Sequence, residues 1–194
     1  MRERANRRTT ATCRLRFAPT QIAEYRNFAK LQNVICHCQL KGEHFVNCEI
    51  LVIGKKQINS IKTLWEKLNE IHLKDSTHFK DHYKYFTFEE RCEKFDEIKN
   101  SNIRIEVIID NNKTVGYCIS TIEKNTGEID SLFIEQEYRK FGFGRQLVEN
   151  SIKWLKANEC KKIMVSVAEG HESVFDFYRK FEFYQRMTYL QLKA

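Results

Sequence analysis

The 194-residue sequence contains one proline, seven glycines and no apolar run that approaches the ~18 residues needed to span a bilayer. No signal-peptide core follows the first charged residues, and no internal repeat or low-complexity tract interrupts the chain. The seven cysteines are odd in number and lack a paired spacing, which favours free thiols over a disulfide framework. We therefore expect a soluble, cytoplasmic protein that is neither fibrous nor disordered throughout.

Positive charge is concentrated at one end of the chain. Residues 1–48 hold nine basic and three acidic side chains, a net charge of +6, which leaves +1 of the total +7 for the later residues. Such a segment is more often a solvated tail than a nucleic-acid-binding domain, so we expect no nucleic-acid partner. Residues 1–48 are expected to form a basic N-terminal extension. This extension could be a disordered segment, an organellar transit peptide or a regulatory arm, and the sequence alone does not separate these interpretations.

Periodic hydrophobic patterns begin at Glu49, and residues 49–194 are expected to form one folded domain. A short strand is predicted over 49–53 and an amphipathic helix over 58–71. Residues 72–86 break the pattern with mixed charges and aromatics. Thr87 and Glu90 then form a capping-box pattern that predicts a helix through Ile98.

The second half of the chain predicts strands followed by a strand-helix-strand crossover. Alternating residues predict three antiparallel strands over 103–109, 114–122 and 128–134. Further patterns predict a helix after the glycine loop, a buried strand over 163–167, a helix over 174–181 and a final strand over 184–192. This order is typical of an α+β fold with a mixed, mostly antiparallel central sheet flanked by helices.

A glycine-containing loop lies between the strand at 128–134 and the helix that follows it. Its backbone amides point out of a helix N-terminus, which attracts phosphate, and its basic residues add positive charge. Neither the P-loop spacing nor the third glycine of a dinucleotide fingerprint is present. The loop therefore predicts a pyrophosphate site whose residues are Arg139, Lys140, Phe141, Gly142, Phe143, Gly144 and Arg145.

Two motifs in this half resemble those of the GNAT superfamily of N-acetyltransferases. The first, Gln/Arg-x-x-Gly-x-Gly/Ala, is matched by Arg139, Gly142 and Gly144. The second, Asn-x-x-Ala-x-x-Phe/Leu-Tyr-x-x-x-Gly-Phe, fits strictly at Phe177, Tyr178 and Phe183. It departs from the family at three positions, which are His171 for Asn, Val174 for Ala and Glu182 for Gly. The resemblance covers about three quarters of the 194 residues.

The resemblance implies a fold and an acyl donor. The fold would be GNAT-like, with a sheet splayed between the fourth and fifth strands counted from Glu49, which are 128–134 and 163–167. The donor would be acetyl-CoA, with its pantetheine arm paired to the backbone of Leu132, Phe133 and Ile134. Amides of the glycine loop would hold its pyrophosphate, and His171 occupies a further cofactor-contact position of the family.

The resemblance also implies candidates for proton transfer. Tyr178 matches a position that supplies a proton to the departing thiolate, although a Phe-Tyr pair at helical spacing also suits core packing. An acceptor ammonium must lose a proton before it attacks, and Glu128 or Asp130 is the candidate base. Both acids are predicted to share a strand face with Leu132 and Ile134, and an edge pair of this kind also suits plain solvation.

The function expected from the resemblance is acetyl transfer to a primary amine by direct attack in a ternary complex. The acceptor would be a small molecule or a peptide, and polyamines, aminoglycosides, amino acids and protein amines stay open. A catalytically silent acyl-CoA-binding module is the alternative, and a homodimer is compatible with either. No metal is expected, because the group Cys36, His37, Cys38, His44 and Cys48 lacks the CxxC pairing of structural zinc sites.

Overall fold

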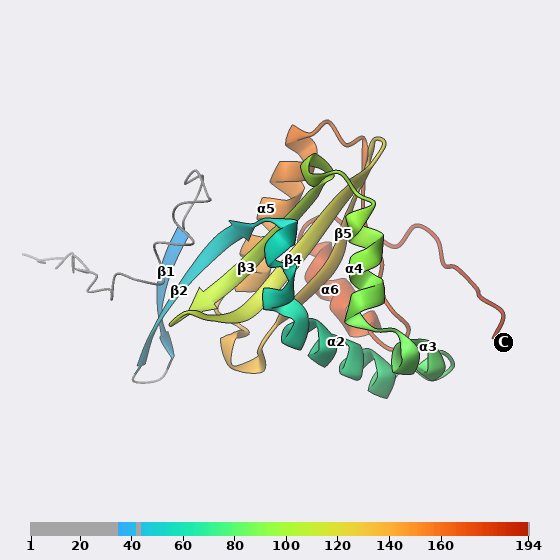
Figure 1. Cartoon of the computed structure of the whole chain (residues 1–194), viewed down its shortest axis with the longest axis horizontal. Helices are drawn as coiled ribbons and strands as arrows, with labels where there is room; N and C mark the ends of the chain where they lie inside the picture. Colours follow the sequence, from blue (N-terminus) through green and yellow to red (C-terminus); the bar gives the residue numbers. More distant parts are fainter. Residues whose placement is uncertain (1–34, 42–43, 194) are drawn as a thin grey trace, which may run out of the picture. The chain divides into compact units, whose positions relative to one another are not determined.

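A computed structural model describes residues 35–41 and 44–193, with side chains described from Cys48 onward (Figure 1). Residues 33–194 group into one compact unit. Most of the expected basic extension, and the cysteine and histidine side chains weighed as a zinc site at 36–38 and 44, lie outside the described part. No described helix combines the length and apolarity needed to cross a membrane.

Six strands form one sheet in the order β1-β2-β3-β4-β5-β6. Neighbouring strands pair antiparallel except for β5 and β6, which are parallel. The α+β prediction with a mixed, mostly antiparallel sheet is thus confirmed. The strands are β1 Ile35–Lys41, β2 His44–Ile53, β3 Ile103–Asp110, β4 Lys113–Glu123, β5 Thr126–Ile134 and β6 Lys162–Val165.

The sheet begins earlier than Glu49. Strand β2 is ten residues long, and its register pairs Cys48 to Ile53 with β3 and His44 to Ile50 with β1. Every strand has two hydrogen-bonding edges, and β2 uses one to pair with β3 and the other to pair with β1. Sequence patterns located only the apolar second half of β2, because that half lies in the hydrophobic core.

The structure confirms the hairpin predicted between the strands at 103–109 and 114–122. Asn111 and Asn112 join β3 to β4 with φ angles of 47° and 65°. Asparagine tolerates this left-handed region, and two successive positive φ angles give a turn whose twist matches that of the flanking strands.

Helical segments occupy each interval that the sequence patterns predicted, and α3 forms in addition within residues 72–86, where no helix was predicted. Helix α4 begins after Thr87, whose Oγ1 accepts from the Glu90 amide at 3.2 Å while the Thr87 amide donates to Glu90 Oε2 at 2.7 Å. This confirms the predicted capping box. The α-helices are α2 Lys62–Asp75, α3 Lys80–Tyr85, α4 Phe88–Asp96, α5 Phe143–Ala157 and α6 Phe175–Arg179, and the 3-10 segments are η1 Lys55–Ile61, η2 Asn100–Asn102, η3 Gln136–Tyr138 and η4 Glu172–Val174.

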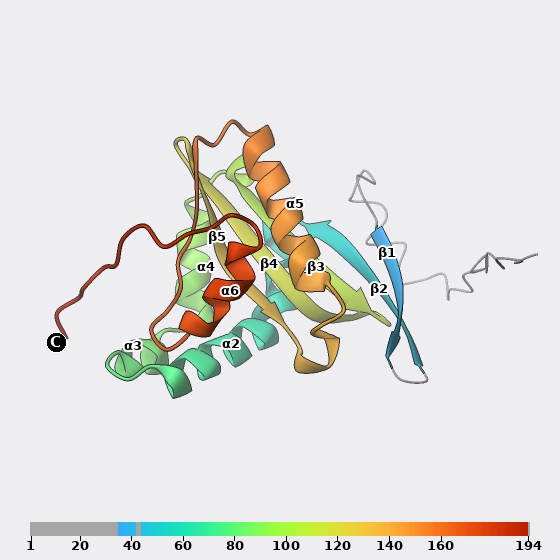
Figure 2. The ribbon, with the colours of Figure 1, turned by 180° about the vertical axis from the view of Figure 1, so that it is seen from behind.

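Helices cover both faces of the sheet (Figures 1 and 2). Helices α2 and α4 cover one face, where Trp65 and Phe95 pack with Tyr117 and Phe133. Helices α5 and α6 cover the opposite face, where α5 packs on Ile129 and Ile134. The sheet is therefore the middle of three layers, and strand β5 contributes side chains to both cores.

A β-bulge changes which side chains of β5 share a face. Ser131 pairs with Ile119, whereas Ile129 pairs with Ser120, so Asp130 is an extra residue without an opposite partner. One inserted residue reverses the alternation that follows it. Leu132 and Ile134 consequently pack on the α5 face, with Ile129. The prediction that they share a face with Glu128 and Asp130 is wrong.

The predicted final strand at 184–192 is also wrong. These residues form no strand, and Tyr184, Leu190 and Leu192 are 74%, 95% and 92% exposed. Their alternating sequence is compatible with a strand. Strand formation, however, depends on pairing with a neighbour and on burial of one face, and the described part of the chain offers this segment neither.

Candidate active site

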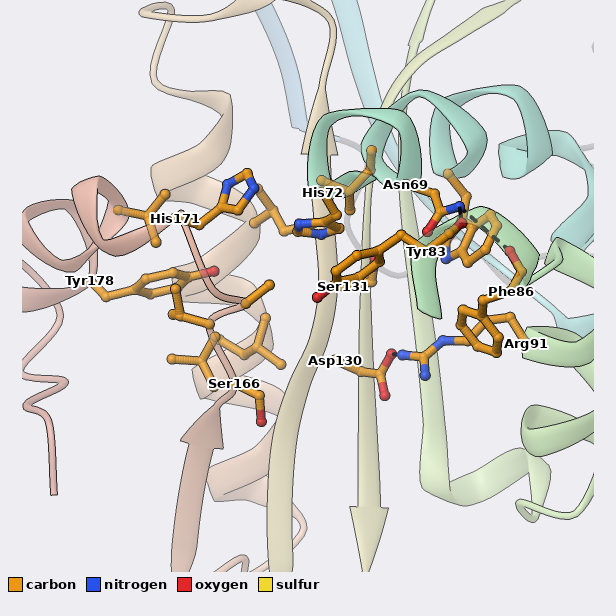
Figure 3. A pocket seen from close by; sticks show the side chains of 18 of the residues that line it. Asn69, His72, Tyr83, Phe86, Arg91, Asp130, Ser131, Ser166, His171 and Tyr178 are labelled. Carbon is orange, nitrogen blue, oxygen red and sulfur yellow. Dashed lines mark hydrogen bonds and ion pairs between the residues drawn. The ribbon is translucent and has the colours of Figure 1, made fainter. Parts of the chain in front are cut away.

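A cavity opens where β5 and β6 diverge. The two strands pair only over Thr126–Ile129 and Lys162–Val165, and beyond these residues β5 has no described partner on its β6 side. The cavity in this gap has a volume of about 480 Å³, and Figure 3 views it from close by. The splay expected between strands 128–134 and 163–167 is therefore present. It leaves an open backbone edge of β5 beside a partly open cavity.

The loop from Arg139 to Gly142 leads into α5 with a backbone that favours anions. Lys140 and Gly142 have φ angles of 68° and 84°, and Gly142 is the N-cap residue of α5. Gly142 has no side chain to cap the helix, and the first turn contains no acidic residue. Left-handed residues at a helix N-terminus orient successive amides toward one point, a concavity suited to phosphate.

Side chains of this loop anchor it and leave its outer surface accessible. Phe143 is 1% exposed and Phe141 packs against the α5-face core. Arg139 donates from Nε to the carbonyl of Ile134 at 2.8 Å, which ties the loop to the end of β5. Arg145 is exposed and donates to Glu149 at 2.7 Å. The geometry thus assigns Arg139 an anchoring contact that the motif alone did not suggest.

Tyr178 is held in place by the way its helix ends. The Phe183 amide donates to the Tyr178 carbonyl at 3.3 Å and the Glu182 amide to the Arg179 carbonyl at 3.1 Å. These two bonds, with a φ of 65° at Glu182, form a Schellman motif, and the rings of Tyr178 and Phe183 pack 5.9 Å apart. Glu182 therefore occupies the position that favours glycine.

The Tyr178 side chain lines the cavity, and Figure 3 shows its hydroxyl directed away from α6. Burial raises the pKa of the Tyr178 phenol well above its ordinary value, and Cys118 adds to the shift. The phenol is consequently protonated at neutral pH. Because Tyr178 lines the cavity, its hydroxyl proton is within reach of a molecule bound there.

The two candidate acids have different surroundings. Asp130 lines the cavity with a side chain only 3% exposed, forms an ion pair with Arg91, and lies 3.7 Å from Lys94 Nζ. Glu128 is not among the cavity-lining residues and accepts a hydrogen bond from Ser166 Oγ at 2.7 Å. The structure therefore brings Asp130, and not Glu128, to the cavity, and surrounds it with positive charge.

A pair of histidines completes one wall. The rings of His72 and His171 meet edge to face with centroids 4.5 Å apart, and His171 Nε2 lies 3.8 Å from Asp75 Oδ2. Burial, with a smaller effect of His171, lowers the pKa of His72 to about 4, so its imidazole is neutral at pH 7. Sequence reasoning missed His72, although it continues the α2 face of Trp65 by helical spacing.

A carboxylate joins the two loops that border the histidine pair. Glu169 accepts hydrogen bonds from Ser76 Oγ at 2.7 Å and from the amides of Thr77 and His78 at 3.1 and 3.0 Å. Next to it, Gly170 has a φ of 85°, and a Cβ there would lie 2.5 Å from the Asp75 carbonyl oxygen. The loop after β6 is therefore fixed against the end of α2.

These features can be compared with known proteins. The sequence profile described as the Acetyltransferase (GNAT) family matches residues 65–183, which include β5, the α5 loop and Tyr178. No curated protein matches the chain significantly.

Solved structures share the fold at low sequence identity. A tetramutant of protein BH1408 from Bacillus halodurans aligns with a TM-score of 0.58 and 18% identity over 75% of this chain and 99% of its own. The aminoglycoside acetyltransferase meta-AAC0020, from an uncultured soil metagenomic sample, was solved in complex with sisomicin. It aligns with a TM-score of 0.57 and 15% identity over 76% of this chain and 96% of its own.

A third structure contains a coenzyme. PaiA N-acetyltransferase from Thermoplasma acidophilum, in complex with coenzyme A, aligns with a TM-score of 0.56 and 15% identity over 69% of this chain and 87% of its own. Identities at this level establish a common fold. Together with the profile match over more than half of the sequence, they lead to one conclusion: this chain belongs to the GNAT acetyltransferase family.

Proposed function

We propose that this protein is an N-acetyltransferase that moves the acetyl group of acetyl-CoA to a primary amine by direct attack within a ternary complex. The observation that carries the proposal is the open edge of β5 beside a cavity, next to a helix N-terminus that begins at a left-handed glycine. Family membership supports the same chemistry.

The residues fit the donor that the family implies. Past Ile129, β5 offers backbone groups of Leu132 to Ile134 to an extended arm, as another strand would. The amides at the start of α5, with Lys140 and Arg145 nearby, suit a pyrophosphate. Acetyl-CoA, when bound, supplies an activated thioester. The chain's own groups then orient it, exclude water and move protons.

Two proton transfers are assigned to side chains at the cavity. Tyr178 keeps its proton through the neutral range and donates it toward the departing sulfur. Asp130, which lines the cavity, is proposed to receive the proton of the acceptor ammonium, directly or through water, and Glu128 to act more remotely through Ser166. His171 is proposed to line the space where donor and acceptor meet.

A silent acyl-CoA-binding module is the second candidate. It is favoured by one observation: Asp130, the only carboxylate among the described residues that line the cavity, is already paired with Arg91 and Lys94. A carboxylate engaged by two cations is a weaker proton acceptor than a free one. On this alternative the protein binds acetyl-CoA without turnover.

Turnover separates the two candidates. Purified protein is mixed with acetyl-CoA and a broad amine panel, and release of free thiol is followed while acetyl-CoA affinity is measured by calorimetry. The proposed enzyme releases thiol in an amine-dependent manner, and the rate falls in a Glu128→Gln, Asp130→Asn double variant with unchanged affinity. Binding without thiol release for any amine would establish the silent module instead.

A further inference from the structure

The cavity has a wall that the donor does not need. Opposite β6 and α6, the α2–α4 side is lined by five flat or aromatic side chains, called here the aromatic wall. Its members are Trp65, His72, His82, Tyr83 and Phe86. The GNAT-like donor site uses the β5 edge and the α5 loop, so this wall faces the remaining space, which is left for the acceptor.

The rings of the aromatic wall are fixed by one another. His72 stacks on Tyr83 at 5.2 Å with an interplanar angle of 28°, and His82 stacks on Phe86 at 5.2 Å and 19°. Trp65 meets Phe86 edge to face at 5.7 Å. The side-chain amide of Asn69 donates to the Tyr83 carbonyl at 2.7 Å, which holds α3 against α2. Fixed rings present preorganised flat surfaces, which favour a flat apolar ligand.

Charge at the cavity is poorly suited to a polycation. Among the lining residues that the structure describes, Asp130 is the single carboxylate, and its partners Arg91 and Lys94 make this cluster net positive. The carboxylates behind the lining are also engaged: Glu128 accepts from Ser166, Glu169 accepts from Ser76, and Asp75 lies 3.8 Å from His171 Nε2. A second or third ammonium on the acceptor would therefore meet no unengaged carboxylate on the described lining, which is costly in a partly closed site. One ammonium, in contrast, can rest over an aromatic face until it loses its proton.

The size of the cavity points the same way. Its volume of about 480 Å³ lies in the lower part of the ~300–1,000 Å³ range of small-molecule sites. The reactive end of the donor must share this space, because Leu132 and Tyr178 line the same cavity. The remaining volume suits a compact acceptor.

We infer that the acceptor is a small primary monoamine that carries a flat apolar or aromatic group, and not a polyamine or an aminoglycoside. The inference rests on the proposed acetyltransferase function. The flat group stacks on Tyr83 and its neighbours, and the amine reaches toward the β5–β6 gap.

A matched amine panel tests this inference on the full-length wild-type protein. Thiol release is compared for 2-phenylethylamine, hexylamine, 1,5-diaminopentane, spermidine and sisomicin. We expect kcat/KM for 2-phenylethylamine to exceed that for 1,5-diaminopentane by at least ~10-fold, because the second ammonium of the diamine has no partner. Preference for the diamine, spermidine or sisomicin would overturn the inference and leave the acetyltransferase proposal intact. No thiol release with any amine would overturn both.

Two tyrosines on one helix provide a variant and its control. Tyr83 belongs to the aromatic wall, whereas Tyr85 is 67% exposed and does not line the cavity. Tyr83→Leu is expected to raise KM for 2-phenylethylamine about 10-fold with acetyl-CoA affinity unchanged, and Tyr85→Leu to change neither. Equal KM values in the two variants would contradict stacking on the wall. Circular dichroism of both variants verifies the fold, and the wild-type panel remains decisive if Tyr83→Leu does not fold.

Discussion

The two sides of the cavity are built from different parts of the chain and by different atoms. The proposed donor side consists of backbone groups of β5 and the α5 loop, which are nearly continuous in sequence. The proposed acceptor side consists of side chains from α2, α3 and α4, together with Asp130 and His171. A backbone cradle depends on φ angles and strand pairing, whereas a side-chain wall depends on which residue stands at each position. A GNAT domain can therefore keep one donor while its acceptor changes.

Tyr178 lies where the two sides of the cavity meet, and the Tyr178→Phe variant is expected to show the largest change in activity. Loss of the hydroxyl should lower kcat by about 10²–10⁴-fold with little change in acetyl-CoA affinity, because only proton donation is removed. Thiol-release assays measure kcat, and calorimetry measures the acetyl-CoA affinity. Tyr184→Phe is the matched control, since Tyr184 is 74% exposed. An unchanged kcat in Tyr178→Phe would remove this residue from the mechanism.

Gly142→Val targets the donor side alone. A β-branched residue at a φ of 84° is strained by about 1–3 kcal/mol, so the loop must shift and the acetyl-CoA Kd should rise roughly 10–100-fold. Gly54→Val is the control, because Gly54 has a φ of −84° and open space around it. Calorimetry that finds equal Kd values for the two variants would argue against an anion cradle at this loop.

The acceptor side should respond to pH through His72. Its folded-state pKa of about 4 lies below the ordinary 6.5, so between these values the unfolded chain binds more protons and stability falls as pH falls. Stability from this group is complete above pH 6.5. In the His72→Phe variant, the free energy of unfolding should fall by about 1–2 kcal/mol less between pH 7 and pH 4 than in the wild type, after an allowance for partial exposure of the ring. Urea unfolding at several pH values measures this difference. Parallel plots of unfolding free energy against pH for the variant and the wild type would refute the prediction.

Glu182→Gly should produce the smallest change. Glycine adopts a φ of 65° without strain, so the variant should be more stable by about 0.5–1 kcal/mol and should hold Tyr178 at least as firmly. Thermal unfolding and kcat are compared with the wild type. A loss of stability would mean that the Glu182 side chain makes a contribution that outweighs the strain.

Sequence patterns predicted turns, caps and the loop before α5 well, because each of these signals is local. The Asn111-Asn112 turn, the Thr87–Glu90 capping box and the α5 loop each depend on a few adjacent residues. The same reasoning failed at Asp130, because a bulge becomes apparent only when β4 and β5 are paired. It failed at residues 184–192 for a related reason: alternation predicts a strand but supplies no neighbour.

Local sequence patterns did not predict which side chains meet on the proposed acceptor side. Residues 72–86 have mixed character, and their helix α3 is only six residues long. His72 and His171 are neighbours only because the loop after β6 docks on the end of α2 through Glu169. The ion pairs of Asp130 likewise come from α4, 39 residues earlier for Arg91.

By itself the sequence determined the order of the elements from the second half of β2 to α6 apart from α3, the glycine loop before α5 and the GNAT motifs, since propensity, periodicity and turn chemistry act over a few residues. Tertiary structure alone decided which acid reaches the cavity, which rings form the acceptor wall and that His72 is kept neutral. Those properties depend on burial, ion pairing and ring stacking between segments far apart in the chain, and such contacts exist only once the sheet and its helices have packed.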